Sequence, residues 1–427
     1  MLPAYHRRSH GGLEETHMRG VLAGMAAVVV FGLVGVAVAQ QPVNVTQWRG
    51  GARDGGATGF APPATWPEQL RQRWKIDVGT GYATPLVVGN RVYIFSRQGD
   101  EEVMSALDAE SGKAVWRTPY AAPFTPMSAA AGHGPGPKST PVLANNRLFS
   151  IGMTGIVTAY DAASGKPLWT KPASPPTQYT THSFSPIIEG SNVIFHVGGQ
   201  DEGALTAFDM ASGTVKWRWA GDGPGYGSPV VVTLGGTRQI VTGTQAKIVG
   251  VEVANGALLW ELPFPTQATT NSLTPLFYGQ TFIIGGNGRP LEAYAPTKRD
   301  NTWVVVKVWE NADVMMRMSN GIIVGDTVFS LSTKNAGQYF IADAKTGKTI
   351  WTSEGRQATN ASIWKAGDTV LSMESDGELV VMRVSATAAE PVRRYKLSDE
   401  ETWGAPSLAG NRLFVKSVNT LALWTVN

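Results

Sequence analysis

The stretch that decides the fold is Ala106-Leu-Asp-Ala-Glu-Ser-Gly-Lys-Ala-Val-Trp116. Four other segments share its pattern of a small or apolar residue first, a glycine seventh and a tryptophan eleventh; they are residues 159–169, 207–217, 250–260 and 341–351. Self-similarity of this kind is the signature of repeat architectures. We therefore interpret the chain as a repeat protein.

A second marker alternates with the first. A Ser or Thr followed by Pro opens a β-branched strand, since proline suits the first residue of a strand, where its missing N–H breaks no ladder bond. The clear copies are Thr84-Pro85, Thr140-Pro141, Ser185-Pro186, Ser228-Pro229 and Thr274-Pro275, and the weaker ones are Asn320-Gly321, Ser362-Ile363 and Ala405-Pro406. Together the two markers divide each repeat into four antiparallel strands, the unit of a β-propeller blade.

The number of blades follows from the aromatic residues on the outer strands, which recur every 42 to 53 residues. We expect eight blades, of which the last, Ala405 to Asn427, is too short for four strands. The strand around Trp74 would complete it and close the ring, which removes the last open sheet edge. The predicted fold is therefore all-β: an eight-bladed propeller of four-stranded antiparallel blades, closed by pairing the N-terminal strand with the C-terminal blade.

The repeated tryptophans are predicted to be structural and to carry no chemistry. Each would lie flat between its own blade and the next, against the glycine of the neighbouring turn. Burying an indole ring removes about 150–250 Å² from water, so these side chains should hold neighbouring blades together. They are Trp74, Trp116, Trp169, Trp217, Trp260, Trp309 and Trp351.

Three segments are expected along the chain. Residues 1–39 form a signal peptide around the apolar run 21–39, with cleavage before Gln40 and with Met18 as a candidate for the true start. The alternative is an uncleaved membrane anchor, since 19 apolar residues can just span a bilayer. Residues 40–65 form an extended N-terminal arm lying over the domain, and residues 66–427 form the propeller.

Composition excludes several classes of function. A formal net charge of +3 without a run of Lys and Arg gives no surface for nucleic acid. The chain has no cysteine, which rules out a lipid-modified cysteine, a disulfide framework and a Cys-x-x-Cys-His haem attachment. His133, His182 and His196 show no metal-ligand spacing.

Two blades, five and seven, and one connection depart from the repeat; in blade seven, residues 382–390 have no glycine at the turn. The connection at residues 117–139 is long and rich in Gly and Pro, and such loops are often functional, although a packed cover explains the composition equally well. In blade five, Ala293-Tyr-Ala-Pro296 lacks the turn motif, and a longer polar loop is expected before Val304.

The repeat and the Ser/Thr-Pro strand starts resemble those of the pyrroloquinoline-quinone (PQQ)-type β-propeller family over residues 66–427. Residues 48–55, 134–138 and 225–229 further resemble an exported bacterial branch, which is similar to the propeller subunit of the outer-membrane β-barrel assembly machinery. The resemblance supports the fold. It does not decide the activity, because propellers host unrelated functions.

The resemblance leaves two hypotheses for function. One is a PQQ- and calcium-dependent quinoprotein dehydrogenase that oxidises an alcohol or sugar. Many alcohol-oxidising members carry a disulfide of adjacent cysteines, which this chain cannot form, and the family's calcium-binding Glu, Asn and Asp match no motif here. We favour the other hypothesis, with no catalytic residue, no metal site and no bound cofactor, and keep PQQ with calcium as the alternative.

The favoured hypothesis is a scaffold in the bacterial periplasm or outside the cell. It would be a monomer without a transmembrane span after signal cleavage, and it would bind an envelope protein, a peptide or a small molecule in the central funnel. The residues just ahead of the strand starts should line that funnel. They are Tyr82, Lys138, His182 (or Ser183), Tyr226, Asn271 (or Ser272), Arg317, Asn360 and Trp403.

Overall fold

The computed structural model describes residues 44–173, 182–199 and 201–426. The predicted signal peptide, its cleavage site and the candidate start at Met18 lie outside these residues. Within the described ranges, no helix has the length and apolar character needed to cross a membrane.

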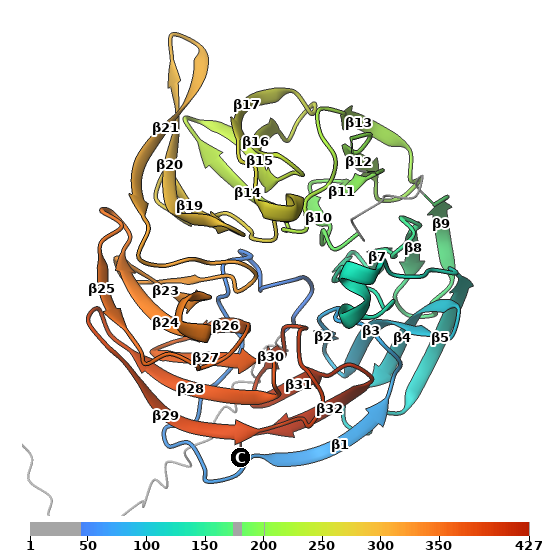
Figure 1. Ribbon diagram of the computed structural model, residues 1–427. Coiled ribbons are helices and arrows are strands. Elements are labelled where there is room, and N and C mark those ends of the chain that lie inside the picture. Colours follow the sequence, from blue (N-terminus) through green and yellow to red (C-terminus); the bar gives the residue numbers. More distant parts are fainter. Residues whose placement is uncertain (1–43, 174–181, 200, 427) are drawn as a thin grey trace, which may run out of the picture. The chain divides into compact units, whose positions relative to one another are not determined.

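Thirty-two strands form eight four-stranded antiparallel sheets around a central axis (Figure 1). The predicted eight-bladed propeller is confirmed. Only three short 3₁₀ helices accompany the strands in the described residues: η1 (Ser128–His133), η2 (Gln267–Thr269) and η3 (Lys334–Ala336).

The blades follow one another along the chain. Blades one to three contain β2 (Leu86–Val88), β3 (Arg91–Gln98), β4 (Glu101–Asp108) and β5 (Ala114–Ala121); β6 (Val142–Ala144), β7 (Arg147–Ile151), β8 (Val157–Asp161) and β9 (Pro167–Lys171); and β10 (Ile187–Glu189), β11 (Asn192–Val197), β12 (Ala204–Asp209) and β13 (Val215–Trp219). Blades four and five contain β14 (Val230–Leu234), β15 (Thr237–Gly243), β16 (Lys247–Glu252) and β17 (Leu258–Pro263); and β18 (Leu276–Tyr278), β19 (Thr281–Gly286), β20 (Arg289–Arg299) and β21 (Thr302–Asn311).

Blades six to eight complete the ring. They contain β22 (Ile322–Val324), β23 (Thr327–Ser332), β24 (Gln338–Asp343) and β25 (Thr349–Thr352); β26 (Ala361–Ala366), β27 (Thr369–Glu374), β28 (Glu378–Val384) and β29 (Ala389–Lys396); and β30 (Ser407–Ala409), β31 (Arg412–Lys416), β32 (Thr420–Thr425) and β1 (Arg71–Asp77). In blade eight β1 pairs antiparallel with β32, from Arg71 opposite Thr425 to Asp77 opposite Thr420. The predicted closure is therefore confirmed.

The two middle strands of each blade lie between the neighbouring blades. In β3 the central side chains Val92 to Arg97 are all buried, whereas the outer strand β5 alternates between exposed and half-buried positions. This difference explains why the middle strands read as continuous apolar runs and the outer strands as an alternating pattern.

The hydroxyls of the Ser/Thr-Pro steps form a belt around the inner surface of the ring. The backbone N–H of Thr84 donates to Thr140 Oγ1 (3.0 Å), and that of Thr140 donates to Ser185 Oγ (3.0 Å). The belt continues from Ser185 to Ser228 (3.1 Å) and from Ser228 to Thr274 (3.1 Å). The proline of each step thus directly precedes a strand, and the residue before it joins two blades.

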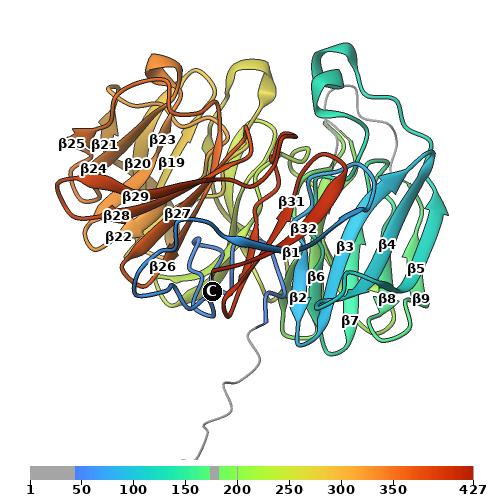
Figure 2. The same ribbon diagram turned by 90° about the horizontal axis from the view of Figure 1, so that it is seen from below.

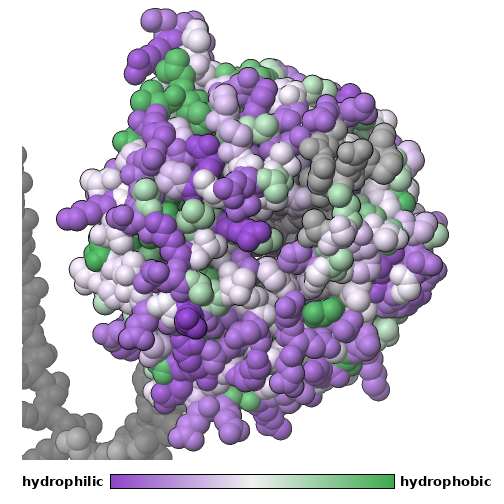
Figure 3. Space-filling view, viewed as in Figure 1, coloured by the Kyte–Doolittle hydropathy of each residue, from purple (hydrophilic) through white to green (hydrophobic). Residues whose placement is uncertain are grey.

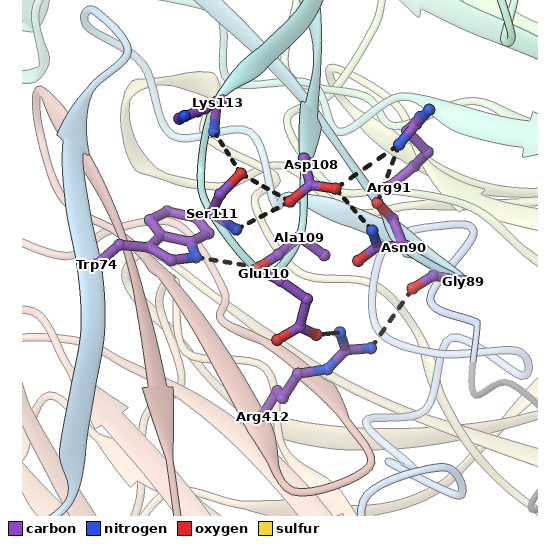
Figure 4. A network of polar contacts seen from close by, with 10 residues as sticks. All are labelled: Trp74, Gly89, Asn90, Arg91, Asp108, Ala109, Glu110, Ser111, Lys113 and Arg412. Carbon is purple, nitrogen blue, oxygen red and sulfur yellow. Dashed lines mark hydrogen bonds and ion pairs between the residues drawn. The ribbon is translucent and has the colours of Figure 1, made fainter.

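The repeated turn supports an aromatic ring from the neighbouring blade (Figure 4). Asp108 Oδ1 accepts hydrogen bonds from the backbone N–H (2.9 Å) and the hydroxyl (2.7 Å) of Ser111. Gly112 has φ +70°, and a Cβ there would lie 3.0 Å from the ring of Trp74, whose Nε1 donates to the carbonyl of Ala109 (3.0 Å). Blades eight and one are thereby joined.

The same contact recurs where the following blade carries the turn motif. The indole Nε1 donates to the corresponding carbonyl at 3.0–3.2 Å in the pairs Trp116–Ala162, Trp169–Met210, Trp217–Val253 and Trp309–Ala344. Trp260 instead donates to Gln239 Oε1 of its own blade (2.7 Å), since blade five lacks the motif. Trp351 packs half-buried against the core between blades six and seven.

Two glycine substitutions separate the contribution of the ring contact from that of the backbone. Gly165 (φ +74°) would place a Cβ 2.4 Å from the ring of Trp116, whereas Gly190 (φ +60°) has nothing within 4 Å of that position. Gly190→Ala should lower the free energy of unfolding only through the strain of an alanine in the left-handed backbone conformation, about 1–2 kcal/mol. Gly165→Ala should add overpacking, for a total of about 2–5 kcal/mol in chemical denaturation. Equal losses would contradict a role for the ring contact.

The prediction of a longer polar loop in blade five is wrong. β20 and β21 pair as far as Arg299 opposite Thr302, so only Asp300 and Asn301 lie between them, both with positive φ (46° and 64°). The hairpin extends beyond the ring (Figure 1), so its polar residues face solvent while its strands continue. Asp and Asn tolerate the positive φ that this two-residue turn requires. The polar composition of the segment is typical of a loop, which is why the sequence did not indicate that the two strands continue.

The N-terminal arm runs along the ring on the side opposite η1 (Figure 2). Val45 pairs with Val87 of blade one, Gly56 with Lys365 of blade seven, and Phe60 with Gly410 of blade eight. The middle part of the arm, residues 47–55, is not extended but forms a series of turns and bends, with positive φ at Arg49 and Arg53.

Candidate functional site

A cavity of about 340 Å³ lies at the centre of the ring. Figure 3 looks onto this face, where hydrophilic side chains border a central hollow on its left. Six of the eight predicted funnel residues line the cavity: Tyr82, Lys138, Tyr226, Arg317, Asn360 and Trp403. That they bind a ligand or partner stays a prediction.

The structure places the other two predicted residues, His182 and Asn271, behind the wall, and the alternatives Ser183 and Ser272 line the cavity. Asn271 is buried, and its Nδ2 donates to the carbonyls of Thr244 (2.8 Å) and Phe264 (3.0 Å). His182 is also buried, and burial together with the nearby His196 lowers its pKa to about 4. Successive side chains of an extended segment point to opposite sides, so a shift of one residue exchanges wall for core.

The N-terminal arm forms the floor of the cavity, which includes Trp48 and Arg49. Arg49 donates to the carbonyls of Gly321 (2.7 Å), Asn320 (3.3 Å) and Ile363 (3.4 Å), in blades six and seven. Burial lowers its pKa to about 10, but it remains a cation at neutral pH.

Arg53 anchors the arm on the other side of the axis. Its guanidinium donates to the carbonyls of Ser185 (3.0 Å), Pro186 and Pro229 (3.2 Å), in blades three and four. Burial lowers its pKa to about 9. The two arginines thus join opposite sides of the ring, a role that we did not predict for the Trp48-Arg49-Gly50 segment.

The connection between β5 and β6, residues 122–141, carries His133 and Lys138 to the cavity; the first five residues of the predicted loop, 117–121, belong to β5. His133 meets Trp403 edge to face, with ring centroids 4.8 Å apart. The loop is held by the buried Arg97, whose guanidinium donates to the carbonyls of Pro135 (2.8 Å) and Ala122 (2.7 Å). Glu102 lies 3.6 Å from the same guanidinium and compensates its charge.

The described lining of the cavity contains no Asp or Glu. Burial lowers the pKa of Lys138 to about 8, and its Nζ has one long contact, with the carbonyl of Gly134 (3.4 Å). Burial raises the pKa of Tyr226 and, together with Glu401, that of Tyr82, each to about 12, so both phenols stay neutral. The site is therefore cationic and rich in hydrogen-bond donors.

Glu374 lies in the wall next to the lining residue Ser375, with its side chain 1% exposed. Tyr339 Oη donates to its Oε1 (2.7 Å), and burial raises its pKa to about 7. Because the folded-state pKa exceeds the unfolded value of 4.5, the stabilisation from the bound proton is complete below pH 4.5 and is lost as pH rises through 7.

Glu374→Gln should therefore stabilise the protein at pH 8 by up to about 3 kcal/mol relative to wild type and leave it nearly unchanged at pH 4.5. Urea unfolding at both pH values measures the difference. Glu378→Gln is the control. Its carboxylate contacts Arg394 at 2.6 Å, and Arg394 also contacts Glu374, so this variant shows how much stability is lost with a contact to that arginine alone. A Glu374→Gln difference that does not grow with pH would count against the buried proton.

The residues present do not fit a calcium-bound quinone. Calcium takes six to eight oxygen ligands, commonly from carboxylates. The lining residues that the structure describes supply no carboxylate, and no group of three or more His, Asp or Glu residues in the described chain could hold a metal ion. The same described residues offer no carboxylate as a general base, so we derive no catalytic step through this cofactor.

The family model described as outer membrane protein assembly factor BamB matches residues 66–131 and 99–353, which together are more than half of the chain. The chain belongs to this family. It is thus a PQQ-like propeller of the BamB type.

Relatives of this BamB-type propeller differ in activity. It is 29% identical over 113 residues to the outer membrane protein assembly factor BamB of Burkholderia pseudomallei (strain K96243). The matched segment covers 26% of each chain. It is 26% identical over 171 residues to subunit 1 of the methanol dehydrogenase [cytochrome c] of Paracoccus denitrificans, which covers 37% of this chain and 26% of the relative. The match thus spans about a quarter of the length of each of these two relatives.

The fold matches the crystal structure of BamB from Moraxella catarrhalis with a TM-score of 0.59 and 16% identity, over 83% of this chain and 99% of that one. At this identity the likeness shows the fold alone.

Proposed function

We propose that this BamB-type propeller is an exported, non-catalytic scaffold of the cell envelope, whose central cavity binds a protein segment or a small molecule. The observation that carries the proposal is the cavity itself, which supplies aromatic rings, cations and hydroxyls but, in its described lining, no carboxylate. Such a set of groups binds and orients a ligand and lacks a carboxylate base or metal ligand. Relatives described as outer membrane assembly factors support the envelope location.

Further features belong to the same proposal. Residues 1–39 would act as a cleaved signal peptide, residues 40–65 as the arm that closes the floor, and the mature protein would be a monomer in the periplasm or outside the cell. The binding residues would be Tyr82, Lys138, Tyr226, Arg317, Asn360 and Trp403, with Ser183 and Ser272 in place of His182 and Asn271.

The alternative is a PQQ- and calcium-dependent dehydrogenase that oxidises an alcohol or sugar, which the likeness to methanol dehydrogenase keeps open. One titration distinguishes the two functions. Purified protein receives PQQ and Ca²⁺, and its absorbance, melting temperature and alcohol-dependent dye reduction are followed. We expect no change in any of them. Saturable PQQ binding with alcohol-dependent dye reduction would replace the scaffold proposal by the enzyme.

A pull-down from envelope extracts tests the scaffold directly. Wild-type protein is compared with a cavity variant (Lys138→Gln, Arg317→Gln, Trp403→Ala) and with a control variant that carries Lys113→Gln, Lys166→Gln and Arg73→Gln, all at exposed positions. We expect a partner that is captured by wild type and the control and lost by the cavity variant. Equal capture by all three would exclude the cavity as the binding site.

A further inference from the structure

Two cations of the cavity have no acidic partner. Arg317 makes no ion pair or hydrogen bond with any residue in the described part of the chain, and the sole bond of Lys138 there is the long contact with Gly134. Lys138 is half-buried, so its charge is poorly compensated by water, whereas Arg317 is solvent-exposed and its charge is largely hydrated. Unpaired cations that face a cavity, above all a half-buried one, favour an anionic ligand.

The wall adds donors to these charges. The hydroxyls of Thr140, Ser185 and Ser228 each accept one backbone N–H of the belt, and within the described residues each makes no other hydrogen bond. Their own protons remain available to a ligand. Thr84 Oγ1 is buried in the wall without any partner in the described residues. A ligand that satisfies this wall must therefore be rich in acceptor oxygens.

The shape restricts how a ligand enters. The arm lies across the end of the axis opposite η1 (Figure 2), and its residues Trp48 and Arg49 line the cavity. Its volume of about 340 Å³ is near the lower limit of ordinary ligand sites, roughly 300–1,000 Å³. A chain end, which is a single strand, needs less room in a cavity of this size than a loop, which brings in two strands. An N-terminal ammonium would meet Lys138, Arg317 and Arg49 in a described lining that holds no carboxylate, whereas a C-terminal carboxylate would be attracted by these cations.

We infer that the cavity captures the C-terminal carboxylate of a partner polypeptide, with Lys138 and Arg317 as its ionic contacts. The inference rests on the proposed scaffold function and names the part of the partner that is recognised. The aromatic side chains of Tyr82, Tyr226 and Trp403 in the wall then pack against the last side chains of the partner, where such rings provide large contact areas at small conformational cost.

The test uses the full mature chain and a random heptapeptide library displayed with free C-termini. We expect enrichment on wild type. The selected peptides are then synthesised twice, with a free carboxylate and with a C-terminal amide. Calorimetric titration should show at least about tenfold weaker binding of the amide, because it lacks the charge-assisted hydrogen bonds.

Variants assign the effect to the cavity. Lys138→Gln should weaken binding of the free acid to about the level of the amide, and Arg317→Gln should weaken it in the same direction. Lys166→Gln, an exposed lysine on a turn, should bind like wild type. Thermal melting of each variant checks that it folds, and the ratio of acid to amide affinity is independent of the folded fraction.

Three results would overturn the inference: no enrichment on wild type, equal affinity for acid and amide, or full displacement of the peptide by millimolar acetate or phosphate, which would point to a small free anion. These results are distinguishable from failure of the scaffold proposal. A partner that is captured from envelope extracts and that tolerates blocking of its C-terminus would leave the scaffold standing and exclude this mode of recognition.

Discussion

Deletion of residues 66–78 is expected to leave a protein that cannot close its ring and that aggregates. β1 supplies the fourth strand of blade eight and pairs with β32 along its length. Without it, β32 would expose an unpaired edge between apolar faces, and the turn at Asp108–Gly112 would lose the ring of Trp74. Open edges of this kind template association with other chains.

Size-exclusion chromatography and the soluble fraction after expression measure this effect. A matched control deletes residues 299–302, the tip of the β20–β21 hairpin, which removes strand residues without opening a new edge. A synthetic peptide of residues 66–78, added during refolding, should restore monomeric protein to the β1 deletion. A soluble monomer with cooperative unfolding in the absence of the peptide would contradict the closure mechanism.

Arg53→Met is the point substitution with the largest expected loss of stability. It removes the donors to three carbonyls in blades three and four, all of them buried by the arm. Each buried acceptor left without a partner costs about 1–3 kcal/mol, or about 3–9 kcal/mol for all three. Relief of the desolvation of the guanidinium offsets part of this cost, so the free energy of unfolding should fall by about 3–6 kcal/mol. Methionine is the replacement because its side chain has a similar bulk and carries no charge.

Chemical denaturation of Arg53→Met should be compared with Arg73→Met, an exposed arginine on β1. We expect the control to stay within about 0.5 kcal/mol of wild type. Limited proteolysis should also cut the arm of Arg53→Met at residues 44–60 faster than that of wild type. An unchanged free energy of unfolding would mean that the arm contributes little to holding the ring.

The repeat pattern allowed the propeller, the number of blades and the closing strand to be predicted, because each is written in local sequence. The position of six funnel residues followed from the same periodicity. The sequence could not decide whether His182 or Ser183, and whether Asn271 or Ser272, faces the cavity. A pattern with a period of more than 40 residues does not define the position of a side chain in an extended segment to within one residue.

The floor of the cavity was beyond prediction for a different reason. Arg49 and Arg53 bind carbonyls that are between 132 and 314 residues away in the sequence. Main-chain carbonyls are present at every residue, so no sequence signal marks which of them an arginine will meet. His133 reached the cavity similarly, through a loop whose course depends on Arg97 and two carbonyls.

The pairing of Arg71 with Thr425 also sets the timing of folding. The two residues are 354 positions apart, and the first strand of the propeller has no partner until the last one exists. At synthesis rates of about 5–20 residues per second, β1 waits roughly 20 to 70 seconds after it emerges. During that interval its edge and the arm ahead of it are available to other proteins. A holding chaperone that binds the emerging N-terminal segment would therefore act on the step that determines whether the ring closes on itself or joins another chain.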